Sequence, residues 1–357
     1  MHFRNFPMVS RMVFGRGAFA QLAELIEPQR RAGGEGVAFI VDAVFRGAPL
    51  ASRLPVQRGD ALLWASAEEE PKTSYVDALT VNVREALGPR PAAVVGIGGG
   101  SVMDLAKAVS LMLTNPGGSA RYQGWDLIRE PAIYHVGVPT LSGTGAEVSR
   151  TAVLTGPEKK LGLNSDYTVF DQILLDPELV ARAPERQRFY TGMDCYIHCV
   201  ESLSGSYLNA FSRAYGEKAL SLCREVFLGE RSPEADDKLM MASYFGGMSI
   251  AYSQVGVAHA TSYGLSYVLG LRHGEGNCVA FQQLEEFYPE GVEEFQRMLD
   301  RAGVTLPSGV TAGLAEEDME RMIDVALSLA PLWENALGTG WREEMPRDRL
   351  RRLFQRM

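Results

Sequence analysis

Hydrophobic and polar residues follow two different patterns along this chain of 357 residues. Up to about residue 180, short apolar runs of strand length are separated by segments whose apolar positions have helical spacing. The predicted strands are residues 37–41, 62–65, 93–97, 134–138 and 173–175. The predicted helices between them include residues 74–87 and 102–113. Strands that alternate with helices predict βαβ units and a mostly parallel sheet.

From about residue 185 onward the strand-like runs stop and long helical patterns take over. The predicted helices are residues 192–204, 211–227, 237–252, 292–302 and 316–329. We find no internal repeat and no low-complexity linker. The pattern therefore predicts an α/β N-terminal domain over residues 1–180 and an all-α C-terminal domain over residues 181–357.

Composition narrows the class of protein. Hydrophobic residues make up 46% of the chain and charged residues 22%, which is typical of a soluble globular protein. A net charge of −9 argues against non-specific binding to nucleic acid or to an anionic membrane, although it leaves room for a local basic pocket. No apolar run approaches the ~20 residues of a membrane span. The start of the chain has neither a long apolar core nor a small-residue cleavage site, so we expect no secretory signal. The four cysteines show no disulfide spacing, so we expect a reduced, cytoplasmic protein.

Three consecutive glycines follow the predicted strand 93–97. Gly98, Gly99 and Gly100 lead into Ser101, which we predict as the cap of the next helix, with Asp104 three positions on completing a capping box. Glycines let a backbone approach a phosphate closely, and the N–H groups that begin a helix attract anions. The loop therefore predicts phosphate binding, although a tight turn that binds nothing would show the same pattern.

Two other features favour a nucleotide. Asp42 directly follows strand 37–41, where a carboxylate can bond both hydroxyls of an adenosine ribose and repel a 2′-phosphate, which favours NAD over NADP. A cap or turn role for Asp42 is an equal alternative. The loop "VPTLSGTGAEVS" offers the hydroxyls of Thr140, Ser142 and Thr144, which suit a pyrophosphate or a nicotinamide ribose but also an ordinary turn.

Asp194 and His198 stand four residues apart in the apolar stretch "GMDCYIHCVES", so a helix presents both on one face. Such a pair offers two ligands to one ion. Two later histidines would complete an Asp/His/His/His set, which suits Zn²⁺ or Fe²⁺. A histidine on an apolar face is more often a core residue, so this alternative stays open. Cys195 and Cys199 share the spacing but project to another face, and we interpret them as small buried hydrophobes.

Several of these stretches together resemble one family. "GGGSVMD", "VPTLSGTGAEVS", "GMDCYIHCVE" and "HATSYGLSYVLGLRHGEGN" resemble the iron-type (group III) alcohol dehydrogenases and occur in that family's order, over residues 10–285. The resemblance implies a Rossmann-like nucleotide-binding domain and the fold shared with dehydroquinate synthase. It also implies one divalent metal, Fe²⁺ or Zn²⁺. Its implied ligands are Asp194, His198, His259 and His273.

The same resemblance implies an NAD(P) site, with NAD favoured. Its implied residues are Asp42, Gly98, Gly99, Gly100, Ser101, Asp104, Thr140, Leu141, Ser142, Thr144, Val153 and Lys160. Tyr263 departs from the family, whose members usually carry a further histidine there, near the nicotinamide and the substrate. We expect Tyr263 or an ordered water to carry the proton out. The segment after His273 is also short for the family.

A closer resemblance is to enzymes that oxidise C8 of 3-deoxy-D-manno-octulosonate (Kdo) for lipopolysaccharide synthesis, on stretches such as "FGRGAFAQL" and "YTGMDCYIHCVESLSG". It implies metal-assisted oxidation of a primary alcohol to an aldehyde, with NAD or O₂ as electron acceptor. An acidic sugar needs cationic partners, although any of the candidates can equally be an ordinary solvated charge. The candidates are Arg121, Arg150, Lys159, Lys160 and Arg272.

Three alternative functions stay open. One is an NAD(P)-dependent alcohol dehydrogenase acting on another small alcohol or polyol. The second is a non-redox lyase of dehydroquinate synthase type, and the third is a non-catalytic nucleotide-binding protein that keeps the fold. In each case we expect a small-molecule partner, no nucleic acid and no membrane, and we also expect a homodimer.

Overall fold

The structure is a computed structural model that describes residues 7–32, 36–67, 69–230 and 232–357. Its described residues form two compact units. The α/β unit extends to Leu141 and resumes over Ala146–Ala183. The helical unit consists of Ser142–Gly145 and Pro184–Met357. The predicted boundary between residues 180 and 181 stays a prediction. A short loop, Ser142–Gly145, packs with the second half of the chain.

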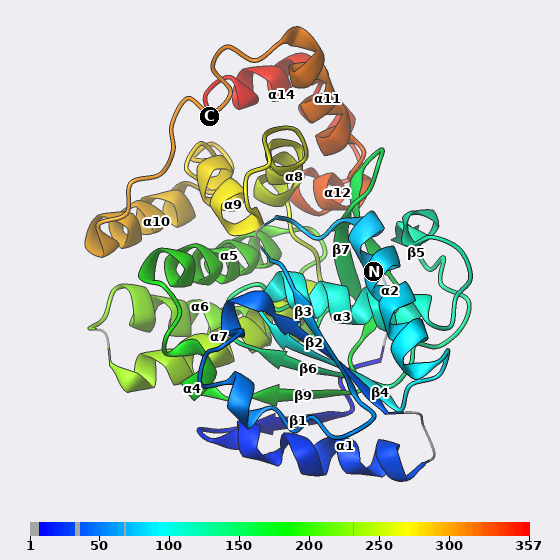
Figure 1. Cartoon of the computed structure of the whole chain (residues 1–357). Coiled ribbons are helices and arrows are strands. Elements are labelled where there is room, and N and C mark those ends of the chain that lie inside the picture. Colours follow the sequence, from blue (N-terminus) through cyan, green and yellow to red (C-terminus); the bar gives the residue numbers. More distant parts are fainter. Residues whose placement is uncertain (1–6, 33–35, 68, 231) are drawn as a thin grey trace. The chain divides into compact units, whose positions relative to one another are not determined.

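A parallel sheet of six strands forms the centre of the α/β unit, in the order β1-β9-β6-β4-β2-β3. Its strands, shown as arrows in Figure 1, are β1 (Arg11–Phe14), β2 (Val37–Asp42), β3 (Ala61–Ala65), β4 (Ala93–Gly98), β6 (His135–Pro139) and β9 (Gln172–Leu175). The chain runs from β2 outward to β3 and then returns to the other side of β2 as β4. In such sheets, ligands bind at the carboxyl ends of the strands where this reversal occurs.

Helices cover both faces of this sheet. Strand residues of β4 alternate in direction, so Val95 and Ile97 join an apolar cluster with Leu22 and Ile26 at α1 (Leu22–Arg31). Gly96 points the other way, where an added Cβ would lie 2.6 Å from Cβ of Ala106 in α3 (Gly100–Met112). Figure 1 accordingly shows α1 and α3 on opposite sides of the strands. Burial on both faces explains why the central strands are continuous apolar runs.

Other elements of the α/β unit lie beside the main sheet. The helix α2 (Thr73–Leu87) contacts α3. A second sheet has the order β5-β8-β7. Its strands are β5 (Gly124–Trp125), β7 (Thr151–Thr155) and β8 (Lys160–Asn164). The short helix α4 (Pro177–Val180) follows β9. The predicted parallel α/β fold of the first half is therefore confirmed.

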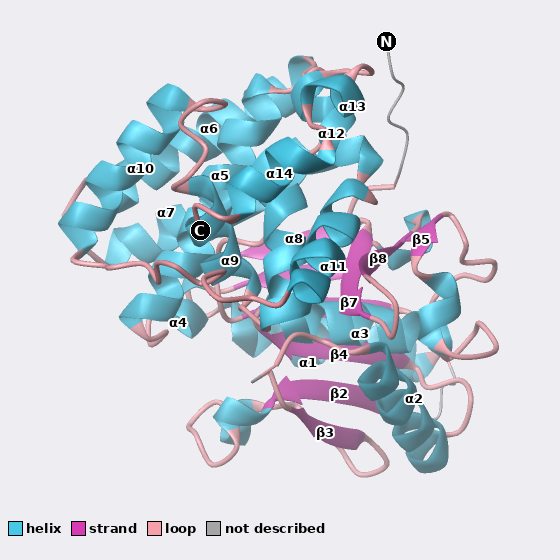
Figure 2. Cartoon of the chain, turned by 90° about the horizontal axis from the view of Figure 1, so that it is seen from above, coloured by secondary structure: helices cyan, strands magenta, loops and turns pink. Residues whose placement is uncertain are grey.

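The helical unit is built around α5 (Glu185–Ser204), which is buried without interruption from Arg188 to Cys199. A helix that is buried on all sides lies in the core of its domain. The other helices are α6 (Ala210–Phe227), α7 (Pro233–Tyr252), α8 (Val257–Leu269), α9 (His273–Phe281), α10 (Pro289–Ala302), α11 (Glu316–Leu327), α12 (Ala330–Leu337), α13 (Trp341–Glu344) and α14 (Arg347–Phe354). Figure 2 shows these elements as helices and loops, so the predicted all-α second half is confirmed.

The fold tests two further predictions from the sequence. Cys195 and Cys199 are fully buried, as predicted, and both are free cysteines. The predicted cap at Ser101 is wrong, because α3 begins one residue earlier, at Gly100, with Gly99 as its cap and no side-chain cap. Among the described residues, none of the helices has the length and apolarity that crossing a membrane requires.

Candidate functional site

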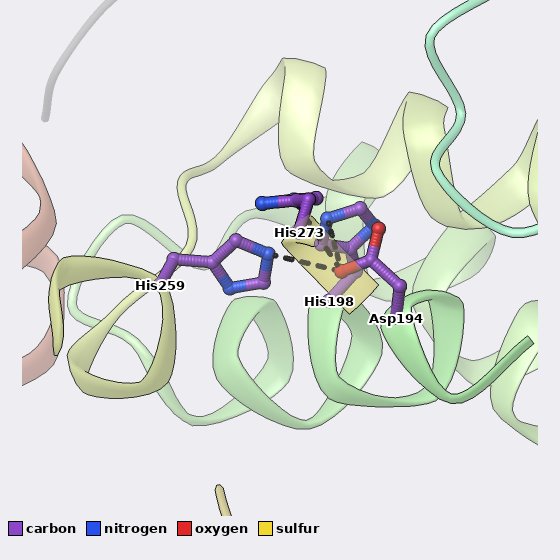
Figure 3. Close-up of side chains that lie close together, drawn as sticks. All are labelled: Asp194, His198, His259 and His273. Atoms are coloured by element: carbon purple, nitrogen blue, oxygen red, sulfur yellow. Dashed lines mark ion pairs between the residues drawn. The ribbon is translucent and has the colours of Figure 1, made fainter. Parts of the chain in front are cut away.

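Four side chains that can ligate a metal ion converge within the helical unit (Figure 3). Asp194 and His198 come from α5, His259 from the first turn of α8, and His273 from the start of α9. One ligand atom from each residue lies within 4.8 Å of the ligand atoms of the other three. The first three side chains are buried, whereas the side chain of His273 is 25% exposed. The structure thus brings together all four residues that the resemblance implied as ligands.

Small residues allow the three helices to meet at this point. An added Cβ at Gly274, next to His273, would lie 2.9 Å from the carbonyl oxygen of Tyr190, so only glycine lets the start of α9 approach α5 this closely. An added Cβ at Gly256, just before α8, would lie 2.6 Å from Tyr288 Oη. The local sequence therefore places His259 and His273 against the face of α5 that carries Asp194.

The distances from Asp194 to the three histidines are close to those between ligands of a single ion. Oδ1 of Asp194 lies 3.4 Å from Nε2 of His259, 3.6 Å from Nε2 of His273 and 3.7 Å from Nε2 of His198. Metal–ligand bonds of about 2.0–2.2 Å in a tetrahedral site separate neighbouring donors by about 3.3–3.6 Å. The buried Oδ2 of Asp194 has no hydrogen-bond partner among the described residues, and such an orphaned carboxylate oxygen is costly without a cation.

Three of the four groups differ in whether they hold a proton in the metal-free protein. Burial would raise the pKa of Asp194, but His198, His273 and His259 hold it well below its usual range. Burial lowers the pKa of His198 to about 3, so this imidazole is neutral. Burial would also lower the pKa of His259, but the carboxylates of Glu201 and Asp194 raise it to about 9. The cluster therefore combines a carboxylate, a neutral imidazole and one strongly basic imidazole.

Two further residues of this site were missed from the sequence. Glu201 lies one turn beyond His198 on the same face of α5, and its Oε2 is 2.5 Å from Nδ1 of His259. Nδ2 of Asn277 donates to Asp194 Oδ1 at 2.6 Å and lies 3.1 Å from Nε2 of His259. Helical spacing could have found both, because Glu201 stands seven residues after Asp194 and Asn277 four after His273.

Tyr263 lies one helical turn after His259 on α8. Its ring centroid is 5.9 Å from that of His273, in an edge-to-face arrangement. Tyr263 is therefore a neighbour of the ligand cluster, and its role in proton transfer stays a prediction.

In the α/β unit, Asp42 and Gly98 end the neighbouring strands β2 and β4, where the strand order reverses. An added Cβ at Gly98 would lie 3.1 Å from Cβ of Asp42 and 2.6 Å from Cβ of Val102, so this position requires glycine. Oδ1 of Asp42 accepts a hydrogen bond of 3.0 Å from Val44 N–H, and burial raises the pKa of the carboxyl group. The turn role of Asp42 is thus present, and its contact with a ribose stays a prediction.

The glycine loop keeps the arrangement that suits an anion. Gly99 precedes α3, and its carbonyl accepts the first bonds of the helix, from the N–H groups of Val102 and Met103, both at 3.0 Å. The N–H groups that begin a helix have no acceptor within it, and the dipole favours negative charge there. Thr140 N–H donates to the carbonyl of Gly98 at 2.8 Å, and an added Cβ at Gly99 would lie 2.8 Å from Leu141. The structure therefore groups Thr140 and Leu141 with the glycine loop.

The remaining predicted cofactor residues belong to different compact units. Ser142 and Thr144 belong to the helical unit, where Gly143 lies so close to Thr191 that no Cβ would fit. Val153 lies in β7, opposite Gly162 of β8. Whether these residues contact a cofactor stays a prediction.

Asp104 and Lys160 lie in a cluster of charged groups. Burial raises the pKa of Asp104 to about 7, although Lys107 opposes this effect, and Nζ of the buried Lys160 lies 3.0 Å from Oε2 of Glu70. Lys107 donates to the carbonyl oxygens of Ser149, at 2.8 Å, and Thr151. Asp104 therefore does not complete a capping box, and Lys160 is already paired with a carboxylate.

The cationic candidates for an acidic sugar also differ. Nη2 of Arg150 lies 2.5 Å from Oδ1 of Asp126 and 3.1 Å from Oδ1 of Asp166. Arg150, like Lys160, thus has an acidic partner within the protein.

Comparison with known proteins covers both halves of the chain. Residues 9–177 match the family described as iron-containing alcohol dehydrogenase, and residues 188–338 match the C-terminal part of the Fe-containing alcohol dehydrogenase family. The chain is 32% identical over 218 residues to sulfoacetaldehyde reductase of Bilophila wadsworthia, covering 59% of this chain and 56% of that protein. It is 27% identical to NAD-dependent methanol dehydrogenase of Bacillus methanolicus, covering 87% of this chain and 83% of that protein.

A third relative is alcohol dehydrogenase 4 of Schizosaccharomyces pombe, 27% identical over 66% of this chain and 57% of that protein. The chain thus aligns with little more than half the length of the Bilophila and Schizosaccharomyces proteins.

Solved structures share the fold. 1,3-propanediol oxidoreductase superposes with a TM-score of 0.82 at 22% identity, over 99% of each chain. Sulfoacetaldehyde reductase from Bifidobacterium kashiwanohense, solved in complex with NAD⁺, superposes with a TM-score of 0.79 at 21% identity, over 99% of this chain and 98% of that one. The predicted fold class is confirmed, and both family matches lie on the units where the structure places the ligand cluster and the glycine loop. The chain belongs to the iron-containing alcohol dehydrogenase family.

Proposed function

We propose that this protein is a metal-dependent oxidoreductase that interconverts an alcohol and its aldehyde with a nicotinamide cofactor. The observation that carries the proposal is the buried convergence of Asp194, His198, His259 and His273. A divalent metal held by these four residues supplies Lewis acidity to an alcohol oxygen. Three imidazoles and one carboxylate suit Fe²⁺ and Zn²⁺ alike, so the choice of metal stays open.

The predicted site residues have separate tasks in this proposal. Asp194, whose pKa lies well below its usual range, stays negatively charged and offsets the charge of a cation. The neutral His198 offers a lone pair without first losing a proton. Tyr263, beside His273, moves the proton of the alcohol towards solvent. The glycine loop binds the cofactor pyrophosphate, and Asp42 binds the adenosine ribose, which favours NAD over NADP.

For the substrate, we propose C8 of Kdo, a primary alcohol on an acidic sugar. Support comes from the sequence resemblance to Kdo-oxidising enzymes. A similar relative is named for sulfoacetaldehyde, which is also a small anionic compound. Of the cationic candidates, Arg150 and Lys160 pair with carboxylates of the protein. We propose that one of the candidates Arg121, Arg150, Lys159, Lys160 and Arg272 meets the carboxylate of the sugar.

The test is an incubation of the metal-loaded protein with Kdo, with and without NAD⁺ and with and without O₂. Mass spectrometry identifies the product, and NADH and peroxide are measured in the same samples. An aldehyde that appears together with NADH supports the proposal. An aldehyde with peroxide and no need for NAD⁺ identifies O₂ as the electron acceptor.

The relative named for sulfoacetaldehyde gives a second candidate substrate class, small anionic aldehydes that are reduced with NADH. Turnover of sulfoacetaldehyde without turnover of Kdo would establish this second candidate. Loss of substrate without net NADH would favour a non-redox lyase. Cofactor binding with no turnover of any substrate would identify a non-catalytic protein.

A further inference from the structure

Glu201 is a buried carboxylate that links two helices of the metal-ligand cluster. It lies on α5, three residues after His198, and its side chain is fully buried. Oε1 accepts a hydrogen bond of 2.6 Å from the backbone N–H of Ala258 in α8. Oε2 lies 2.5 Å from Nδ1 of His259, one residue further along α8. Both carboxylate oxygens are therefore committed to adjacent residues of one helix.

This geometry determines which nitrogen of His259 keeps its hydrogen when the other nitrogen binds a metal. A carboxylate only accepts hydrogen bonds, so Nδ1 of His259 must be the donor, and Nε2 is the nitrogen that faces Asp194. A ligating histidine needs its free lone pair on the nitrogen that faces the metal. A hydrogen bond from its other nitrogen to a carboxylate fixes both the tautomer and the ring orientation.

The three histidines are not held alike. Nδ1 of the buried His198 has no hydrogen-bond partner among the residues that the structure describes. Gly256 leaves room for the Glu201 carboxylate, because an added Cβ at Gly256 would lie only 3.3 Å from Oε1 of Glu201. Tyr288 Oη, at 3.5 Å, stands behind the same oxygen. The carboxylate of Glu201 is therefore packed against the beginning of α8, the helix that carries His259.

We propose that Glu201 is a positioning residue that holds His259 in the Nδ1–H tautomer, with Nε2 directed at the metal. This inference rests on the proposed function, since it assumes that His259 is a ligand. Glu201 itself touches neither metal nor substrate in this account and acts through His259.

Glu201→Gln gives a sharp test, because an amide offers one acceptor and one donor where the carboxylate offers two acceptors. If the Gln oxygen accepts from Ala258 N–H, its NH₂ group donates to Nδ1 of His259. That bond forces the hydrogen to Nε2 and blocks ligation. We expect the dissociation constant for Zn²⁺ or Co²⁺ to rise by about 10–100-fold, and the visible absorption spectrum of bound Co²⁺ to change.

The matched control is Tyr288→Phe, which removes the third neighbour of the Glu201 carboxylate and leaves His259 untouched. We expect wild-type metal affinity and an unchanged Co²⁺ spectrum for this variant. A double variant with His259→Ala completes the cycle: if Glu201 acts through His259, adding Glu201→Gln to His259→Ala weakens metal binding no further. Wild-type Co²⁺ affinity and spectrum in Glu201→Gln would overturn the inference.

If Glu201→Gln fails to fold, the wild-type protein still decides the question. ¹⁵N NMR of the histidine-labelled, Zn²⁺-loaded protein reports the tautomer of each ring, and loss of signals in His259→Ala assigns His259. A protonated Nδ1 on His259 supports the inference, and an unprotonated Nδ1 refutes it. Absence of metal binding by the wild-type protein would instead refute the proposed function, so the two failures are distinguishable.

Discussion

At the scale of single residues, the basicity of His259 has a measurable consequence for metal uptake. Its pKa of about 9 lies above the ordinary 6.5, so near neutral pH the metal-free protein holds a proton that ligation must displace. We predict that binding of Zn²⁺ near neutral pH releases about one proton from His259, and that the affinity increases as the pH rises towards 9. Calorimetric titrations in two buffers of different ionisation enthalpy measure the released protons.

The raised pKa of His259 has the opposite effect on the stability of the metal-free protein, which falls as the pH rises. A raised folded-state pKa contributes stability that is fully present below 6.5 and is lost as the pH rises through about 9. Metal uptake without any proton release near neutral pH would contradict this description of His259.

Tyr263 is predicted to carry a proton, and its hydroxyl group can be removed alone. Tyr263→Phe keeps the ring that lies edge-on to His273. Because general acid–base groups typically contribute about 10²–10⁴-fold, we expect kcat to fall at least 100-fold with unchanged metal content. Steady-state kinetics beside elemental analysis measure both quantities. If the variant retains wild-type kcat, another group or an ordered water carries the proton.

At the scale of elements, the junction of β4 and α3 in the proposed cofactor site leaves no room for a side chain at Gly98. In Gly98→Ala, the new methyl group would lie 2.6 Å from Val102 and 3.1 Å from Asp42, so the loop must shift away from its phosphate-binding shape. We predict at least a tenfold rise in the dissociation constant of NAD⁺, with metal affinity unchanged. Fluorescence titration with NADH and a metal titration test the two statements.

Gly340→Ala provides the control for this substitution, because an added Cβ at Gly340 has no heavy atom within 4 Å. Both dissociation constants should stay at wild-type values in the control. Equal NAD⁺ affinity of Gly98→Ala and Gly340→Ala would remove the glycine loop from the cofactor site.

Most elements of the fold followed from the sequence where burial gives a clear pattern. The strands β2 and β4 are continuous apolar runs because helices cover both of their faces. By contrast, α8 and α9 were not predicted as helices: their stretches, "VAHATSYGLSYVL" and "HGEGNCVAF", are rich in small residues and carry no polar stripe. The cap of α3 was misplaced because Ser101 has the preferred chemistry of a cap, whereas the chain turns one residue earlier at Gly99.

The candidate site could be predicted only in part from the sequence, because its residues come from several helices. Asp194 and His198 follow from helical spacing, whereas His259 and His273 needed the resemblance because they lie on other helices. Glu201 and Asn277 stand at helical spacing from Asp194 and His273, but spacing alone does not show that they hydrogen-bond to ligands on other helices. Glu201 has a second partner in Ala258 N–H, which becomes visible only once α5 and α8 are packed.

At the scale of the whole molecule, metal binding should stabilise the fold. The ligands come from α5, α8 and α9, so an ion bound by all four side chains joins three helices that unfolding would separate. Any ligand that binds only the folded state stabilises it in proportion to the logarithm of its concentration. We predict that chelation lowers the Tm and that added Zn²⁺ restores it, whereas His259→Ala shows a smaller response. A Tm that is indifferent to chelator and metal would contradict a four-ligand site.

The central claim is that a metal held by this cluster is required for alcohol oxidation, and one measurement tests it most directly. Protein stripped of metal is divided, and one part is reloaded with Fe²⁺ or Zn²⁺ under anaerobic conditions. NADH formation is then followed with Kdo and NAD⁺. We predict turnover only in the reloaded wild-type protein, and none in the stripped protein or in His259→Ala. Equal turnover by stripped and reloaded protein would contradict the account.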